Sequence, residues 1–315
     1  MIAALKRWQN ILIVVAIALL FTALLNPAVP MQRDLRTYLF VVDITQSMNT
    51  VDLKLKGEPV SRIAYARYLL QQAVRELPCG THVSLGIFSA ENVGLLYTPI
   101  EVCSNFEPIQ KSIGNLEWRM AWRGNSRLRF GVMSAASIVS SLPKPANVIF
   151  ITDGDEAPKL NAINKLDLSN WKGGEDWLLV GVGNDTPSPI PKLDSDNKVL
   201  GYWAYANSIM APSQVQSEES MGTRDDSIAT AEYNRYLSYL DEPYLKELSE
   251  EIGATYHRGL RPEPLVKAME NLDVKAQEQV PTSLRTGALL VSILLILTGY
   301  LPHLKDKLYA LSRKI

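Results

Sequence analysis

Residues 37–48 read TYLFVVDITQSM, and they give the strongest indication of the fold class. Its first six residues carry no charge and are aromatic, leucine or β-branched, a composition typical of a strand buried on both faces of a parallel sheet. The strand ends at an aspartate, after which Asp43, Thr45 and Ser47 occupy alternate positions. Ligands of open parallel sheets bind beyond the carboxyl ends of the strands, so these three oxygen-bearing side chains are candidates for a binding site.

The pattern returns further along the chain. Residues 147–152 (NVIFIT) predict a second buried strand, which also ends at an aspartate, Asp153. Apolar periodicity predicts helices between the strands, and two runs before residue 100 predict a hairpin. We therefore expect an α/β fold, doubly wound and Rossmann-like, with a mostly parallel central sheet and one antiparallel edge strand. Further strands are expected at 82–89, 94–98, 177–182 and 254–257, and helices at 62–77, 106–116, 128–142, 242–253 and 263–272, with irregular structure over 184–240.

Two apolar runs lie near the ends of the 315-residue chain, at 11–25 and 287–301. Basic residues lie on the outer side of each run, which predicts two transmembrane helices with both termini in the cytoplasm. A cleaved signal peptide is the alternative for the first run, although a small-x-small cleavage site is missing. The expected division is an N-terminal anchor at 1–30, a domain at 31–275, and a transmembrane helix with a basic tail at 276–315.

The net charge of −1 and the absence of a basic block give no reason to expect nucleic-acid binding. Cys79 and Cys103 precede and follow the predicted hairpin, whose ends lie close together. A disulfide between them is therefore expected if the domain is extracytoplasmic, and two buried free thiols are the alternative.

Three separated motifs together resemble the metal-ion-dependent adhesion site of von Willebrand factor A domains. They are Asp43-x-Thr45-x-Ser47, Gly124-Asn125-Ser126 and Thr152-Asp153-Gly154. The resemblance implies that Ser47 and Ser126 bind a divalent cation directly and that Asp43 and Asp153 bind mostly through waters, with Thr45 in a supporting role. Mg²⁺ is the expected ion, with Ca²⁺ and Mn²⁺ left open. In such domains the ion takes an acidic side chain from a partner protein, so no enzymatic activity is expected.

The second half of the chain resembles membrane-anchored bacterial A-domain proteins, on residues 189–191, 238–242 and 253–256. These include the Bat-type aerotolerance proteins and the A-domain proteins that accompany methanol dehydrogenase. The stretch 116–128 (LEWRMAWRGNSRL) favours the second group, which implies maturation of a periplasmic quinoprotein. The resemblance also implies an inner-membrane protein with a periplasmic A domain that works with a MoxR-type AAA+ ATPase and other A-domain proteins.

Tryptophans and arginines gather just before Ser126, and these residue types are enriched in binding hot spots. We expect a partner surface there, with ordinary packing under a loop as the alternative. The residues are Trp118, Arg119, Trp122 and Arg123.

A phosphoaspartyl enzyme is the alternative from another functional class, since Asp43-x-Thr-x-Ser resembles the nucleophile loop of transport ATPases. The lysine that follows the nucleophile in that loop is absent here, and no lysine can be assigned to the transferring phosphoryl group. Asp155 and Glu156 are expected to be solvated loop charges.

Overall fold

The computed structural model covers residues 1–315 and describes all of them except 1, 162–163, 204–236, 274–275 and 313–315. The chain divides into two compact units. One unit is Leu35–Ala276, called the central domain below, and the other combines Met1–Asp34 with Gln277–Ile315, called the terminal unit.

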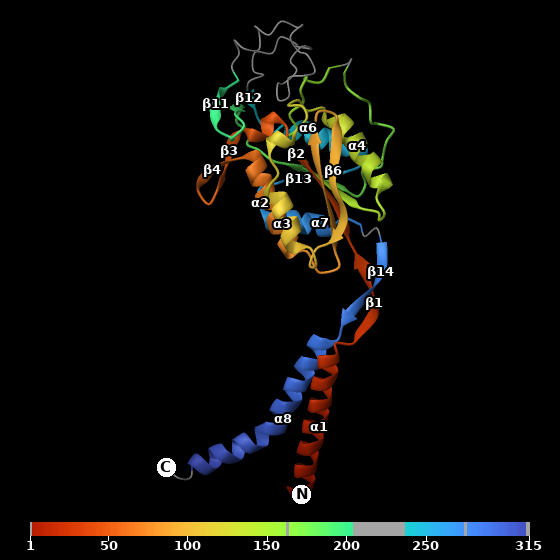
Figure 1. The fold of residues 1–315 in the computed structure, drawn as a ribbon, viewed down its shortest axis with the longest axis vertical. Helices are drawn as coiled ribbons and strands as arrows, with labels where there is room; N and C mark the ends of the chain where they lie inside the picture. Colours follow the sequence, from red (N-terminus) through yellow and green to blue (C-terminus); the bar gives the residue numbers. More distant parts are fainter. Residues whose placement is uncertain (1, 162–163, 204–236, 274–275, 313–315) are drawn as a thin grey trace. The chain divides into compact units, whose positions relative to one another are not determined.

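The central domain is built on a six-stranded sheet with strand order β13-β8-β7-β2-β5-β6 (Figure 1). All neighbours are parallel except β5 and β6, which form an antiparallel pair at one edge. This confirms the predicted mixed sheet and its antiparallel edge. The strands are β2 (Thr37–Asp43), β5 (His82–Ser89), β6 (Asn92–Glu101), β7 (Asn147–Thr152), β8 (Trp177–Gly181) and β13 (Thr255–Arg258).

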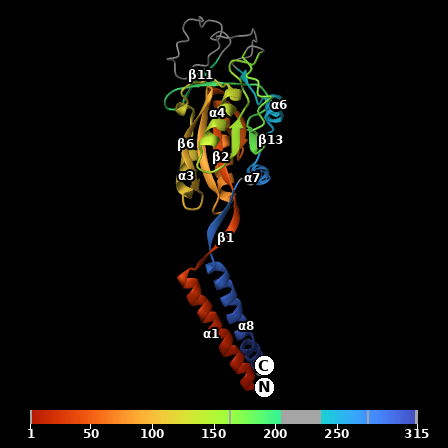
Figure 2. The same ribbon diagram turned by 90° about the vertical axis from the view of Figure 1, so that its right-hand side faces the viewer.

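Strand β2 is buried along its whole length because helices cover both faces of the sheet (Figures 1 and 2). Successive side chains of a strand point to opposite faces. Tyr38, Phe40 and Val42 accordingly enter one core cluster, while Leu39 and Val41 enter the other. The helices are α2 (Arg62–Glu76), α3 (Phe106–Gly114), α4 (Leu128–Ser141), α6 (Glu242–Ile252) and α7 (Pro262–Glu270).

Helix α2 begins where its cap predicts, since the Ser61 hydroxyl accepts a hydrogen bond from the amide of Ala64. The expected loop before it is instead the antiparallel hairpin β3–β4 (Val51–Leu55 and Glu58–Ser61), which the short turn at Gly57 permits. A 3-10 turn, η1 (Gln46–Asn49), joins β2 to this hairpin, and a second, η2 (Trp118–Met120), precedes α4.

The expected irregular region contains short antiparallel pairs, and residues 204–236 of it lie outside the described part. Backbone hydrogen bonds form these short strands although the proline-rich sequence has no strand periodicity. The pairs are β9 (Ser188–Pro189) with β12 (Leu237–Ser238), and β10 (Pro191–Leu193) with β11 (Val199–Tyr202).

Cys79 and Cys103 form a disulfide with a Cα–Cα distance of 5.2 Å, which confirms the predicted pairing. Glu101 supports the bridge by accepting hydrogen bonds from the amides of Gly80 (2.8 Å) and Cys103 (3.0 Å). Burial raises the pKa of Glu101, but these backbone donors and Ser104 outweigh it and hold that pKa at about 2.

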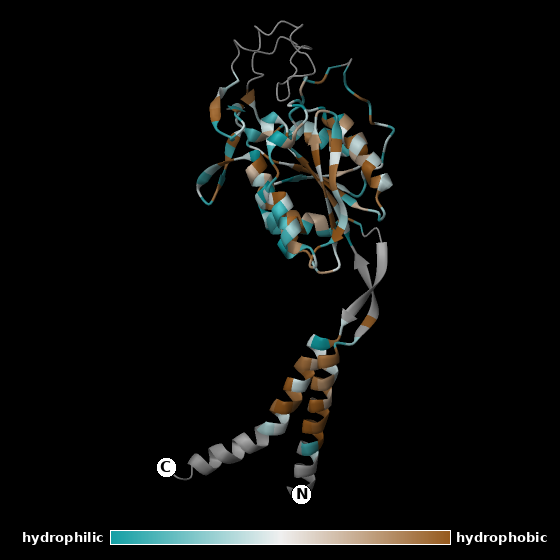
Figure 3. Ribbon diagram, viewed as in Figure 1, coloured by the Kyte–Doolittle hydropathy of each residue, from teal (hydrophilic) through white to brown (hydrophobic). Residues whose placement is uncertain are grey.

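The terminal unit contains helices α1 (Ile2–Leu25) and α8 (Arg285–Ser312) and the paired strands β1 (Ala28–Leu35) and β14 (Ala276–Ser283). Figure 3 shows apolar residues along the described parts of both helices. Among the described residues, however, none of the helices has both the length and the apolar character needed to cross a bilayer. The prediction of two transmembrane helices is therefore not supported.

Candidate functional site

Two buried aspartates meet at the carboxyl ends of neighbouring strands. Asp43 is the last residue of β2, and Asp153 directly follows β7. Strands β2 and β7 are parallel, with Val42 opposite Ile151, so their ends lie at the same edge of the sheet. Neither aspartate has any exposed surface. The sheet topology thus brings together the two carboxylates that the sequence motifs singled out.

Threonines hold the carboxylate of Asp43 at both oxygens. One oxygen, Oδ1, accepts hydrogen bonds from the amide and the hydroxyl of Thr45, at 2.9 and 2.7 Å. The other, Oδ2, accepts one from the hydroxyl of Thr152 at 2.7 Å. Burial and the negative charge of Asp153 raise the pKa of Asp43 to about 7, against the lowering effect of these donors. Thr45 therefore orients an aspartate, and Thr152 does the same from the neighbouring strand.

Both oxygens of Asp153 are also partnered. Oδ2 lies 2.6 Å from Nη1 of Arg62, and Oδ1 accepts the amide of Asp155 at 3.0 Å. Burial raises the pKa of Asp153, and the Arg62 charge opposes that rise. All four carboxylate oxygens of the pair thus already accept hydrogen bonds from protein groups. This arrangement suits aspartates that reach an ion through intervening water.

The two serines lie on loops that are joined to each other and to the Asp153 loop. Ser47 is in η1, where its Oγ lies 3.5 Å from the hydroxyl of Thr45. The Ser126 loop contacts η1 through a hydrogen bond from the amide of Gln46 to the carbonyl of Gly124. It contacts the Asp153 loop through a bond from the amide of Ala157 to the carbonyl of Ser126, 2.8 Å long.

Gly124 explains why these loops pack so closely. A Cβ at that position would lie 2.8 Å from the side chain of Gln46, so only glycine fits without a shift of that side chain. The predicted motif Gly124-Asn125-Ser126 therefore has a steric reason for its glycine.

The Ser126 hydroxyl is the feature of the site that best supports a bound ion. It is buried and has no hydrogen-bond partner among the described residues. A buried hydroxyl without a partner costs free energy, which a ligand at this position removes. The loops joined to the Ser126 loop carry hydroxyl and carboxylate oxygens, the ligand atoms that hard divalent cations prefer. The residues present therefore fit a Mg²⁺-type ion.

Arg62 was not predicted as a site residue, because the sequence indicates only that a helix begins there. Its side chain has no exposed surface. Nε and Nη2 donate to one oxygen of Asp52 at 3.0 and 2.6 Å, and Nη1 also donates to the Ser238 hydroxyl at 2.7 Å. One signal was available, because a cation in the first turn of a helix is opposed by the helix dipole. Such a residue needs acidic partners from elsewhere in the fold.

Two residues of the expected partner surface also make hydrogen bonds within the chain. Nε1 of Trp118 donates to Asn197 at 2.7 Å, and the guanidinium of Arg119 donates to Glu117 at 2.6 Å and to the carbonyl of Ser195. These bonds hold the turn between β10 and β11. The side chain of Arg119 is still 43% exposed, so Trp118 and Arg119 stay predictions as partner contacts. Trp122 is 36% exposed and stays a prediction as a partner contact, as does Arg123.

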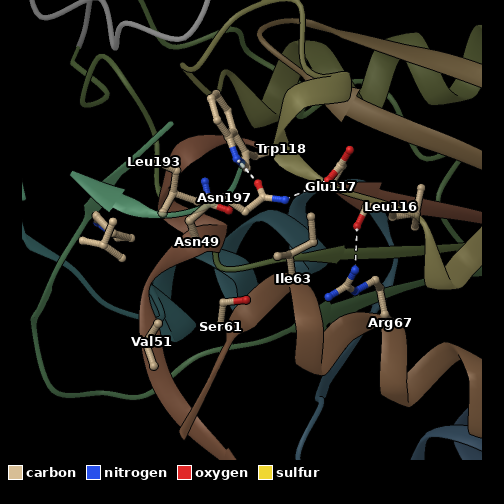
Figure 4. A pocket seen from close by; sticks show the side chains of 12 residues that line it. Asn49, Val51, Ser61, Ile63, Arg67, Leu116, Glu117, Trp118, Leu193 and Asn197 are labelled. Carbon is tan, nitrogen blue, oxygen red and sulfur yellow. Dashed lines mark hydrogen bonds between the residues drawn. The ribbon is translucent and has the colours of Figure 1, made fainter. Parts of the chain in front are cut away.

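A pocket of about 270 Å³ lies beneath that turn (Figure 4). The chain of hydrogen bonds from Trp118 through Asn197 to Glu117 runs along it. Apolar side chains from several elements complete its lining, among them Val51, Ile63, Leu116, Leu193 and Val199.

Asp155 and Glu156 are not solvated, contrary to expectation, because α4 and α6 cover the loop that carries them. They are 4% and 3% exposed. Oε1 of Glu156 accepts the amide of Leu128 at 3.1 Å and the hydroxyl of Tyr244 at 2.6 Å. Burial is the main cause that raises the pKa of Glu156 from 4.5 to about 7.

Replacing Glu156 by glutamine is therefore expected to stabilise the protein at pH 8. The folded carboxyl keeps its proton up to about pH 7, whereas the unfolded one loses it near 4.5. Stability consequently falls as pH rises between these values, and the full cost is present above pH 7. Glu156→Gln should raise the free energy of unfolding by about 2–3 kcal/mol at pH 8 and change it little at pH 4.

Urea unfolding at both pH values measures this effect. Glu247→Gln is the matched control, because Glu247 is exposed, pairs with Lys165 and has a lowered pKa. An equal effect of Glu156→Gln at pH 4 and pH 8 would contradict the assignment.

Comparison with known proteins gives one family. Residues 38–156 match the model of the von Willebrand factor type A domain. No curated protein matches the chain by sequence comparison.

Several solved structures are similar to the chain at low identity. An aerotolerance-related membrane protein from Bacteroides fragilis is 16% identical, with 75% of this chain and 98% of that chain covered and a TM-score of 0.49. BatB from Bacteroides thetaiotaomicron is 17% identical, with 74% and 95% covered and a TM-score of 0.49. A von Willebrand factor type A protein from Catenulispora acidiphila is 16% identical, with 46% and 33% covered and a TM-score of 0.34.

Proposed function

From the von Willebrand factor type A domain that residues 38–156 carry, we propose that this chain is a metal-dependent protein-binding module. It uses a divalent cation to capture an acidic side chain of a partner protein and catalyses no reaction. The buried hydroxyl of Ser126, which has no hydrogen-bond partner in the part of the chain that the structure describes, is the observation that carries the proposal. It lies on a loop joined to both the Asp43 and the Asp153 loops, where a ligand would satisfy it.

Each residue of the site has a distinct role in this proposal. Ser47 and Ser126 hold the ion with their hydroxyls, and the partnered carboxylates of Asp43 and Asp153 attract it. Thr45 keeps the Asp43 carboxylate oriented through two hydrogen bonds. When bound, such an ion supplies an electron-poor centre that accepts a carboxylate from outside the chain. Mg²⁺ is the proposed ion, with Ca²⁺ and Mn²⁺ as alternatives.

The environment of Asp43 argues against a phosphoaspartyl enzyme. A nucleophilic carboxylate needs an oxygen that its substrate can approach. Asp43 is fully buried, and both its oxygens accept hydrogen bonds from Thr45 and Thr152. The buried cation nearby, Arg62, contacts Asp153 at 2.6 Å. These contacts favour a binding site over a site of phosphoryl transfer.

Replacing Ser126 by alanine tests the ion site directly. The affinity for Mg²⁺ or Mn²⁺ is expected to fall about tenfold or more, because a direct ligand is lost. Stability without the ion should rise by about 1 kcal/mol, because alanine removes a buried hydroxyl that has no hydrogen-bond partner among the described residues. Isothermal titration with each ion and thermal unfolding in EDTA give both readouts.

Ser249→Ala is the control, since Ser249 is equally buried but lies in α6 and donates to the carbonyl of Lys246. It should leave ion affinity unchanged. Undiminished ion binding by the Ser126→Ala variant would sink the proposed site, as would a natural chain that binds none of the three ions.

We also propose a location for the module: the periplasmic side of the bacterial inner membrane. The disulfide supports an oxidising compartment for the domain. Exposed apolar side chains on α1 and α8 support attachment to a membrane, for example Leu24 (76% exposed) and Leu290 (65%). Alkaline extraction of membranes, with protease protection of the domain, distinguishes this location from a free protein in either compartment.

For the partner, we propose a periplasmic protein under assembly, such as a quinoprotein of the methanol dehydrogenase type. The alternative is an envelope complex of the aerotolerance type that works with a MoxR-type ATPase and other A-domain proteins. Both rest on the sequence resemblance of residues 116–128 and of the second half of the chain. Crosslinking in cells distinguishes the two alternatives by the partner that is recovered with the natural chain. That partner should be lost with the Ser126→Ala variant, which serves as the control.

A further inference from the structure

We infer that Arg62 sets the charge of the ion site, so that a bound divalent cation keeps its attraction for an acidic partner. This inference rests on the proposed function and assigns a role to a residue outside the adhesion motifs. Arg62 is a positioning residue here, because it contacts the aspartates and supplies no ligand atom to a cation.

The guanidinium lies at the centre of a buried acidic cluster. Its Nη1 is 2.6 Å from Asp153, its Nη2 is 2.6 Å from Asp52, and the side chains of all three residues are at most 1% exposed. Asp52 also accepts the amide of Asn184 at 3.1 Å, so the cluster ties together loops from three parts of the chain. Ser238 takes the remaining donors through its hydroxyl and its carbonyl.

Space for the guanidinium is built into the fold. Gly183 has φ +148°, a backbone conformation that L side chains rarely adopt, and a Cβ there would lie 3.0 Å from Nε of Arg62. Glycine at this position therefore keeps the backbone against the buried cation.

Counting the charges shows what the cation does. The guanidinium contacts the buried carboxylates of Asp52 and Asp153, and the charge of Asp153 acts in turn on the buried carboxylate of Asp43. Together these three carboxylates and one guanidinium carry a net charge of −2 when all are ionised. The nearby Asp155 pairs with Lys159 at 3.2 Å and adds no net charge. A divalent cation therefore brings the cluster to neutrality, and an incoming carboxylate meets no excess negative charge.

Without Arg62 the same carboxylates would carry −3. An ion would then bind more tightly, because an opposing positive charge is gone from a buried site. The loaded cluster would keep a charge of −1, which repels the carboxylate of a partner. Arg62 thus lowers the affinity for the ion and raises the affinity of the loaded site for an acidic group.

Arg62→Gln tests this on the full chain with Mn²⁺ as the probe. Mn²⁺ affinity, measured by electron paramagnetic resonance of the free ion, is expected to rise about tenfold. Binding of acetate to the Mn²⁺-loaded protein, followed by water-proton relaxation, should weaken about threefold or more. Arg62→Lys keeps the charge and should give values close to those of the natural chain in both measurements. The double variant Arg62→Gln/Asp52→Asn restores the net charge of −2. Its Mn²⁺ and acetate affinities should therefore return toward those of the natural chain.

Asp52→Asn keeps the test open if Arg62→Gln does not fold. It removes one negative charge and leaves Arg62 on Asp153, so Mn²⁺ affinity should fall about fivefold. If Arg62→Gln, or Asp52→Asn where Arg62→Gln does not fold, binds Mn²⁺ with the same affinity as the natural chain, the inference about Arg62 is overturned and the proposed function is not. Failure of the natural chain to bind Mn²⁺, Mg²⁺ or Ca²⁺ overturns the proposed function and this inference with it.

Discussion

Asp153→Ala is expected to lower the free energy of unfolding of the central domain by about 3 kcal/mol in the absence of divalent ions. The substitution leaves the fully buried guanidinium of Arg62 without its 2.6 Å contact to Asp153. Loss of one partner of a buried ion pair costs about 3–5 kcal/mol. The low end applies because Arg62 keeps Asp52 and because Asp43 loses a repelling neighbour.

Chemical unfolding in EDTA measures this loss. Asp185→Ala is the matched control, since Asp185 pairs with Arg258 at 2.7 Å but has a side chain that is 65% exposed. An exposed pair contributes at most about 1 kcal/mol, so this variant should remain close to the natural stability. If Asp153→Ala proves as stable as that control, Arg62 is not held by Asp153 in solution.

Gly131→Ala is expected to destabilise the protein although it places a better helix former in α4. Alanine gains about 1 kcal/mol over glycine inside a helix. Its Cβ, however, would lie 2.3 Å from Cε2 of Phe88, a buried ring that packs edge-on against Phe150. Overpacking of this kind costs about 1–3 kcal/mol or more, and the closeness of the contact points to the upper end. We expect a net loss of about 2 kcal/mol.

Thermal and chemical unfolding test the sign of this effect. Gly114→Ala serves as the control, because its Cβ would approach only the end of the flexible Gln71 side chain, at 3.0 Å. It should change stability by less than about 0.5 kcal/mol. A Gly131→Ala variant that is more stable than the natural chain would show that α4 does not pack on Phe88 as described.

The strand ends of the site were predictable because they depend on local sequence. A charge-free run ending in Asp43, and another ending in Asp153, predict parallel strands whose carboxyl ends share an edge. Thr45 and Ser47 lie at alternate positions in the short segment directly after the first strand, so they were expected near the same strand end. The cysteines were predictable for a similar reason, since a hairpin between Cys79 and Cys103 brings its own ends together.

The partners of these residues were not predictable, because they come from distant parts of the chain. Arg62 and Asp153 are 91 positions apart, and Arg62 and Ser238 are 176 apart. Trp118 bonds to Asn197, 79 positions away, so its sequence neighbours did not reveal this contact. The sequence predicted Glu156 to be a solvated loop charge, because its partner Tyr244 lies on α6, far along the chain.

A mostly parallel sheet and two strand-end aspartates with hydroxyls beside them follow from the sequence alone, because the pattern of a buried strand lies in consecutive residues. The charge of the site depends on the tertiary structure. The packing of α2 against the loop ends places the Arg62 guanidinium 2.6 Å from Asp153, and electrostatic energy inside a protein depends on such distances and on burial rather than on sequence separation.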